Sequence, residues 1–126
     1  MYKYKAVVKN VVDGDTVDLS VDLGFDVWYN VRVRVDGIDT PEKWHPYGKV
    51  VKKYVKQVLE GKEIFITSNG RDKYGRYLVD ITMAGFRETF NQHLIDQKMA
   101  KAYGGGSRDD TWTEAELEQT GHRLLK

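Results

Sequence analysis

Apolar and polar residues alternate along the first part of the chain, which is the pattern of half-buried β-strands. Between Thr16 and Leu23 the apolar residues point one way and the aspartates and Ser20 the other. In the next stretch three valines alternate with Arg32 and Arg34, which places the two arginines on one face. Asp13-Gly14 is a hairpin turn signal. We therefore predict three consecutive strands, at Tyr2 to Val12, Thr16 to Leu23 and about Val27 to Val35.

The apolar period changes to that of a helix after a loop from Gly37 to Pro46. Gly61 supplies the stop of this helix, whose apolar residues are Val50, Val51, Tyr54, Val55, Val58 and Leu59. Four lysines fall on its other side and indicate either a solvated face or a phosphate-attracting stripe: Lys49, Lys52, Lys53 and Lys56.

The rest of the chain predicts two more strands and two more helices. The second helix buries Phe90 and Leu94 one turn apart, and Thr113 with Glu116 has the capping-box spacing that opens the last one. In chain order the segments are the strand Lys62 to Thr67, the polar loop Ser68 to Gly75, the strand Tyr77 to Met83, the helix from about Arg87 to Lys98 and the glycine-rich link Gly104 to Asp110.

Three strands, a helix and two further strands follow the order of a Greek-key barrel of the OB-fold type. We therefore predict an α+β, mainly β protein: a five-stranded Greek-key OB-fold barrel with about three helices. A chain of 126 residues is too short for two cores of useful size, so residues 1–126 are expected to form a single domain.

The composition of the chain limits which binding partners and which cellular compartment are expected. Net charge is +1, from 20 Lys and Arg against 19 Asp and Glu, so a polyanion would have to meet local patches. No apolar run reaches the roughly 20 residues of a membrane helix, and no cysteine is present for disulfides or thiolate metal sites. The start MYKYKAVVKN has no signal-peptide stretch. We expect a cytoplasmic monomer, secreted only if a leader was removed, and a phage or mobile-element origin fits so short a chain.

Three polar segments gather charged groups beside predicted turns at strand ends: Asp13-Gly14-Asp15-Thr16, Arg34 to Glu42, and Asp72-Lys73-Tyr74-Gly75-Arg76. Each segment alone has a structural explanation, because such residues close hairpins, start helices and form tight turns. Together they supply what phosphodiester cleavage requires. That reaction needs an activated water, stabilised charge on the phosphate oxygens and a way to handle the leaving oxygen.

Oxygen ligands and guanidinium groups are the useful chemistry in these segments. Asp15, Asp39 and the carbonyl of Thr40 offer the oxygen ligands that Ca²⁺ prefers, although carboxylate count alone leaves Mg²⁺ and Mn²⁺ open. Arg34 and Arg76 can each present a planar fork to phosphate oxygens.

Glu42 and the histidines complete the candidate chemistry. Glu42, after a proline that stiffens the loop, could accept a proton from water or could brace the loop. A zinc site is not expected, since the histidines lie far apart without ligand spacing: His45, His93 and His122.

Three motifs occur along the chain in the order DGDT, R-x4-DTPE and DKYGR. In these motifs and their order the sequence resembles the staphylococcal nuclease (thermonuclease) family, from about Val8 to about Tyr103. The resemblance implies a Ca²⁺ site, a pair of arginines that clamp the scissile phosphate, a general base and residues beside the bound nucleotide. In that order the implied residues are Asp15, Asp39 and the Thr40 carbonyl; Arg34 and Arg76; Glu42; and Lys73, Tyr74 and Tyr103.

Family members cleave DNA and RNA with little base preference and leave 3′-phosphate and 5′-hydroxyl ends. The resemblance therefore implies a calcium-dependent nuclease, for which we expect single strands to be preferred. One departure is Asp36, which on an extended strand would share a face with Arg34. It could pair with Arg34 and weaken the phosphate clamp, or it could add negative charge near the metal. The alternative is a non-catalytic OB-fold that binds single strands or a protein, with Trp28, Tyr29 and Trp44 as stacking platforms.

Overall fold

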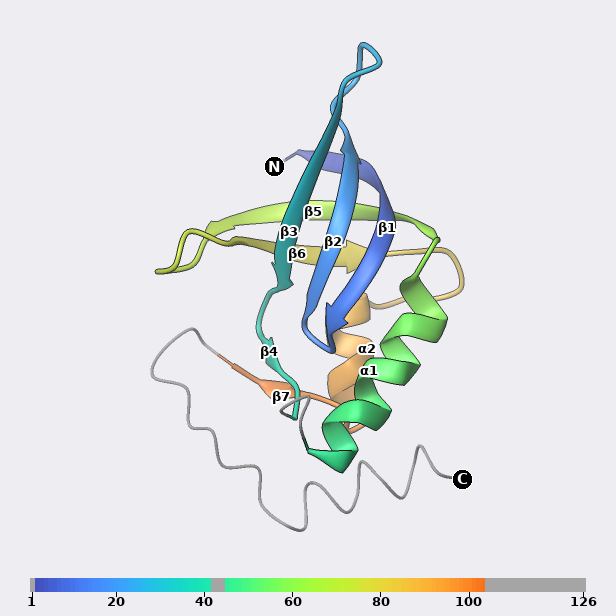
Figure 1. Ribbon diagram of the computed structural model, residues 1–126, viewed down its shortest axis with the longest axis vertical. Helices are drawn as coiled ribbons and strands as arrows, with labels where there is room; N and C mark the ends of the chain where they lie inside the picture. The colour runs from blue at the N-terminus through green and yellow to red at the C-terminus, as the bar shows by residue number, and fades with distance from the viewer. Residues whose placement is uncertain (1, 42–44, 104–126) are drawn as a thin grey trace.

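Five strands close into a barrel in the computed structural model, which describes residues 2–41 and 45–103 (Figure 1). They are β1 (Lys3–Asp13), β2 (Thr16–Asp22), β3 (Trp28–Val35), β5 (Glu63–Arg71) and β6 (Tyr77–Thr82). Pairing follows the order β1, β2, β3, β6, β5, and β5 pairs back with β1. The β3–β6 pair is parallel and the others are antiparallel. The predicted OB-fold barrel is thereby confirmed.

β1 is a long strand that pairs with β5 through its first half and with β2 through its second half. Its pairing with β2 is irregular between Val8 and Asn10 and again between Val11 and Asp13. Such bulges bend a strand and increase its twist, which a closed barrel requires. The inward residues of the strands fill the barrel, and among them Val8, Val17 and Val35 are fully buried.

The first helix, α1 (Pro46–Leu59), begins and ends for identifiable reasons. His45 is its N-cap and its Nδ1 accepts a hydrogen bond from the Tyr47 N–H, while Pro46 occupies the first helical position. Proline suits that position because its missing N–H would have no partner within the helix. Gly61 stops the helix as predicted, at φ +79°, a conformation that favours glycine.

The segment from Gly37 to Pro46, predicted to be a loop, contains a short strand. β4 (Ile38–Asp39) pairs antiparallel with β7 (Lys101–Ala102) in a separate two-stranded sheet. Pairing with residues some sixty positions later cannot be read from a local pattern. Ile38 is nearly fully buried, so its apolar side chain anchors this segment against the core.

The second helix, α2 (Phe90–Asp96), is shorter than predicted at both ends. Thr89 caps its start by accepting a hydrogen bond from the Gln92 N–H, and Lys98 at φ +62° lies beyond its end. Phe90 and Leu94 are buried one turn apart, as predicted. Similarly, the predicted loop from Ser68 to Gly75 is shorter, because β5 continues to Arg71 across a bulge.

The two helices and the β4–β7 pair lie at one end of the barrel, and the β2–β3 hairpin lies at the other (Figure 1). Neither helix of the described residues has the length and apolar character needed to cross a bilayer. The link Gly104 to Asp110 and the final helix predicted from Thr113 lie outside the described residues.

Candidate active site

Asp15 stands in the β1–β2 turn, directly before β2, and is nearly fully buried. Its Oδ1 accepts a hydrogen bond from Thr16 Oγ1 at 3.1 Å, and its Oδ2 accepts one from the Thr40 N–H at 3.3 Å. The turn can approach Thr40 this closely because it contains Gly14. A Cβ atom at Gly14 would lie 2.9 Å from Thr40 Oγ1 and 3.0 Å from two Thr40 carbons.

Arg34, near the end of β3, joins the two predicted aspartate ligands. Thr16 is its partner in the β2–β3 ladder, so Asp15 comes within reach of its side chain. Arg34 Nη1 lies 3.5 Å from Asp15 Oδ2, and Nη2 lies 3.9 Å from Asp39 Oδ1. Nη2 also donates to the Ile38 carbonyl at 3.1 Å.

Tyr103 is placed beside the same guanidinium group. Its ring centroid lies 5.5 Å from Arg34 Cζ, within the range of a cation–π contact. The Tyr103 N–H donates to the Gly37 carbonyl at 2.9 Å, which extends the β4–β7 pairing. Four segments thus converge on Arg34: the turn after β1, the end of β3, the β4 segment and the chain after β7.

We call Asp15, Arg34, Asp39 and Thr40 the Arg34 cluster. All four are at most 8% exposed. Removing charged groups from water costs about as much free energy as their mutual attraction returns. Such a cluster therefore adds little to the stability of the fold. Buried groups of opposite charge at the edge of a fold are more typical of functional sites.

A second group lies in the β5–β6 loop around Asp72. Asp72 Oδ1 accepts hydrogen bonds from the Tyr74 and Arg76 N–H groups, both at 2.9 Å, and Oδ2 accepts one from Arg76 Nε at 2.8 Å. Burial raises the pKa of Asp72, but these bonds from Arg76 and Tyr74 outweigh burial and leave the pKa below its usual value. The Tyr74 ring lies 5.3 Å from Lys73 Nζ and 5.5 Å from Arg76 Cζ.

The β3–β6 ladder brings these two groups near each other, although Arg76 pairs with Asp72 and not with the Arg34 cluster. Arg34 is the partner of Leu78 in the parallel β3–β6 ladder. Tyr77, which follows Arg76 directly, is the partner of Val33, which precedes Arg34. The β3–β6 ladder therefore brings the backbone of Arg76 close to that of Arg34.

The Arg34 cluster offers oxygen ligands only. No group of three His, Cys, Asp or Glu side chains within residues 2–41 and 45–103 is arranged to hold a metal ion. An ion bound by Asp15 and Asp39 would need backbone carbonyl and water oxygens as well, a mixture that suits Ca²⁺. The donor chemistry of the cluster therefore fits the predicted ion. Glu42 lies outside the described residues.

Asp36 does not pair with Arg34. Its Oδ2 accepts a hydrogen bond from Asn69 Nδ2 at 2.9 Å, because the chain turns away after β3 and carries the Asp36 side chain toward β5. The predicted pairing of Asp36 with Arg34 is therefore wrong.

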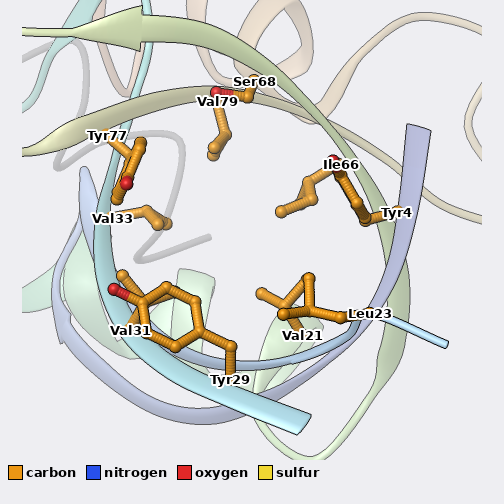
Figure 2. Close-up of a pocket in the computed structure, with 10 residues that line it drawn as sticks. All are labelled: Tyr4, Val21, Leu23, Tyr29, Val31, Val33, Ile66, Ser68, Tyr77 and Val79. Carbon is orange, nitrogen blue, oxygen red and sulfur yellow. The ribbon is translucent and has the colours of Figure 1, made fainter. Parts of the chain in front are cut away.

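A different hollow opens at the other end of the barrel (Figure 2). Its volume is about 190 Å³, and it is lined by six aliphatic residues, three tyrosines and Ser68. It has no charged side chain in its lining that could hold a metal ion or clamp a phosphate. Trp28 and Tyr29, which lie near this end, are about half exposed. Trp44 lies outside the described residues.

The contacts of two residues, Asp72 and Gly14, were not predicted from the sequence. Asp72 precedes Tyr74 by two residues, the spacing of a side chain that caps a turn, and this signal could have been used. Gly14 was assigned only to a hairpin turn. Its approach to Thr40 joins positions far apart in sequence, so no local pattern reports it.

Several known proteins that are similar to this chain are described as nucleases or endonucleases. A family model described as staphylococcal nuclease homologue matches residues 32–122. The chain is 35% identical over 104 residues to a thermonuclease of Staphylococcus intermedius, covering 76% of this chain and 58% of that protein. It is 38% identical over 71 residues to an uncharacterized endonuclease of Escherichia coli, covering 56% and 43%.

A micrococcal nuclease of Shigella flexneri is 29% identical over 130 residues, covering 96% of this chain and 72% of that protein. The chain thus spans about half the length of the first two relatives.

Proposed function

Because the chain belongs to the staphylococcal nuclease family, we propose that it is a nuclease that hydrolyses phosphodiester bonds in DNA and RNA. The observation that carries the proposal is the Arg34 cluster, in which two carboxylates and a guanidinium group from separate segments meet at one edge of the barrel. We further propose little base preference, a preference for single strands, and 3′-phosphate and 5′-hydroxyl products.

Arg34 and Arg76 bind the scissile phosphate in this proposal. A planar guanidinium group donates two parallel hydrogen bonds to phosphate oxygens and stabilises charge that grows during attack. Asp15 and Asp39 hold Arg34 from two sides, and Asp72 holds Arg76 through Nε. Because Arg76 Nε donates to Asp72, the Nη groups of Arg76 are the ones that donate to the phosphate.

Asp15, Asp39 and the Thr40 carbonyl are the proposed holders of Ca²⁺. When bound, the ion would supply Lewis-acid stabilisation of the phosphate charge and a water of lowered pKa. The Thr40 N–H bond to Asp15 fixes the position of that carboxylate before substrate arrives.

The remaining predicted residues have roles in substrate positioning and proton transfer. Glu42 is proposed as the general base that accepts a proton from the attacking water. Lys73 and Tyr74 are proposed beside the terminal phosphate of the bound nucleotide. Tyr103, whose ring lies against Arg34, is proposed to pack against that nucleotide.

Digestion of end-labelled single-stranded DNA and RNA under a panel of divalent ions tests the proposal. We expect cleavage with Ca²⁺, none in excess chelator, and fragments with 3′-phosphate ends. Unchanged digestion in chelator would remove the metal from the mechanism. Cleavage with Mg²⁺ or Mn²⁺ but not with Ca²⁺ would assign the site to one of those ions instead. Strand binding without any product under every ion would favour the non-catalytic OB-fold instead.

A further inference from the structure

Four lysines of α1 line an open hollow of about 350 Å³ on the protein surface: Lys49, Lys52, Lys53 and Lys56. We call these residues the lysine stripe. The opposite side of the helix is buried and consists of Gly48, Val51, Val55 and Leu59. A helix with one buried side needs polar residues on the other, but it does not need residues of one charge. No Asp or Glu occurs within Pro46–Leu59.

This distribution of charge disfavours the helix that carries it. Lys49 and Lys53, and likewise Lys52 and Lys56, are like charges four residues apart, where they repel. Lys49 also lies near the first turn, at the positive end of the helix dipole. Of the four ammonium groups, only that of Lys56 has a carboxylate of the described residues within 4.0 Å, that of Glu60 at 3.9 Å. A local cost without a structural gain indicates a functional partner of opposite charge.

We propose that the lysine stripe binds backbone phosphates of the nucleic-acid strand whose scissile phosphate lies at the Arg34 cluster. This inference rests on the proposed function. Pro46 follows Thr40 by six residues, so α1 begins within about 21 Å of the cluster. Figure 1 shows α1 beginning at the end of the molecule that carries the β4–β7 pair. From Lys49 to Lys56 the helix rises about 10 Å, the length of about three phosphates along one strand of a duplex.

The surroundings of the stripe favour nucleic acid over an anionic membrane surface. A helix that lies on a membrane places large apolar side chains beside its lysines. Among the described residues, the exposed large apolar side chains lie on the strands and in loops and not on α1. Recognition by charge alone, without apolar contact, is how proteins bind the phosphate backbone.

The test measures binding of a labelled single-stranded oligonucleotide in chelator, where no turnover occurs, over a series of salt concentrations. The stripe variant carries Lys49→Gln, Lys52→Gln, Lys53→Gln and Lys56→Gln. The control variant removes the same charge from four exposed lysines of other segments, with Lys3→Gln, Lys5→Gln, Lys9→Gln and Lys62→Gln. A third variant, with Lys49→Arg, Lys52→Arg, Lys53→Arg and Lys56→Arg, keeps the charge.

We expect the slope of log Kd against log salt to fall by about 2 in the stripe variant, because the stripe spans about three phosphates and each neutralised phosphate of a single strand contributes about 0.7. The slope should stay close to that of the original protein in the control and arginine variants. Circular dichroism checks that each variant folds. If the quadruple variant does not fold, Lys52→Gln and Lys53→Gln alone should each lower the slope by about 0.7.

An unchanged slope in the folded stripe variant overturns the inference, and so does an equal loss in the control variant. Loss of binding to phosphatidylglycerol vesicles with unaltered strand binding would assign the stripe to a membrane surface instead. Failure of the inference is distinct from failure of the proposed function. If the protein binds strands through the stripe but does not cut them, only the proposed function is wrong. If it cuts strands but the salt slope is the same in the stripe variant, only the inference about the stripe is wrong.

Discussion

Arg34 is the residue on which the candidate site is assembled. Two carboxylates, a backbone carbonyl and an aromatic ring surround its guanidinium group. Removing the charge would leave two buried carboxylates without their cation, which costs stability as well as catalysis. A lysine at this position keeps the charge but loses the planar fork, so it separates the two effects.

We predict that Arg34→Lys lowers kcat for single-stranded DNA by about 10²-fold or more, the effect of losing one preorganised charge donor. Arg32→Lys is the matched control, because Arg32 lies two residues away on the same strand but is exposed and pairs with Asp18. The control should keep kcat within about twofold. Steady-state rates and melting temperatures of both variants check this, and equal rates would remove Arg34 from the clamp.

Gly14 is a second position where one atom should matter. We predict that Gly14→Ala destabilises the fold by about 1 to 3 kcal/mol, since its Cβ would overlap Thr40. Thr40→Ala removes two of the three contacted atoms, so the double variant should be more stable than the sum of the single changes. Denaturant unfolding of all four proteins gives the coupling free energy. A value of zero would mean that the two residues do not touch.

At the residue scale, the sequence motifs contain residues that the structure brings together, but the motifs do not predict the contacts between them. Asp15, Asp39 and Thr40 stand in motifs whose order implied a common site, and the structure brings them together at Arg34. Which atom bonds to which depends on approach between distant turns. Asp36 illustrates the limit, because strand alternation alone assigned it to the wrong neighbour.

The β2–β3 hairpin carries an ion pair whose effect can be measured by acid titration. Asp18 and Arg32 are partners in the ladder, and Arg32 Nε donates to Asp18 Oδ1 at 2.7 Å. The hydrogen bond from Arg32 holds the pKa of Asp18 below its usual value. A lowered pKa in the folded state stabilises the fold above the unfolded value of about 3.9, and this contribution disappears as pH falls through the folded pKa.

We therefore predict that the original protein loses melting temperature more steeply below about pH 4 than Asp18→Asn does. Above about pH 5 the variant should be slightly less stable, since the pair is partly exposed and solvent weakens it. Thermal unfolding from acid to neutral pH checks the two curves. Parallel curves over the whole range would show that the pair contributes nothing.

The β5–β6 loop is the second element with a testable role. Asp72 bonds to two backbone N–H groups and to Arg76, so we infer that it positions Arg76. We predict that Asp72→Ala lowers kcat by about tenfold or more, since misplacing a catalytic group is costly. In the Arg76→Ala background the same change should have little further effect. Equal losses in both backgrounds would show that Asp72 acts independently of Arg76.

Among elements, those with their own apolar period were predicted well and those made by pairing were not. The barrel strands and α1 each carry a period that identifies them, with boundaries shifted by a few residues. The β4–β7 pair has two residues on each side and no period of its own. It nevertheless positions Asp39, Thr40 and Tyr103, so the element hardest to predict is central to the site.

At the scale of the whole molecule, the barrel separates two surfaces. The Arg34 cluster lies toward the end that carries the helices, and the apolar hollow lies at the opposite end (Figure 2). A net charge of +1 gives no overall attraction for a polyanion, so local groups must bind it. The cluster, the Asp72 loop and the lysine stripe are the described groups suited to that task.

Asp15 and Asp39 are proposed to hold one ion that cleavage of the strand requires. Initial rates of single-stranded DNA cleavage against Ca²⁺ concentration, for the original protein, Asp15→Asn and Asp39→Asn, test this claim most directly. We predict no cleavage without Ca²⁺, and in both variants a lower maximal rate and a higher half-saturating Ca²⁺ concentration. A variant whose curve coincides with that of the original protein, or cleavage that persists without the ion, would contradict the claim.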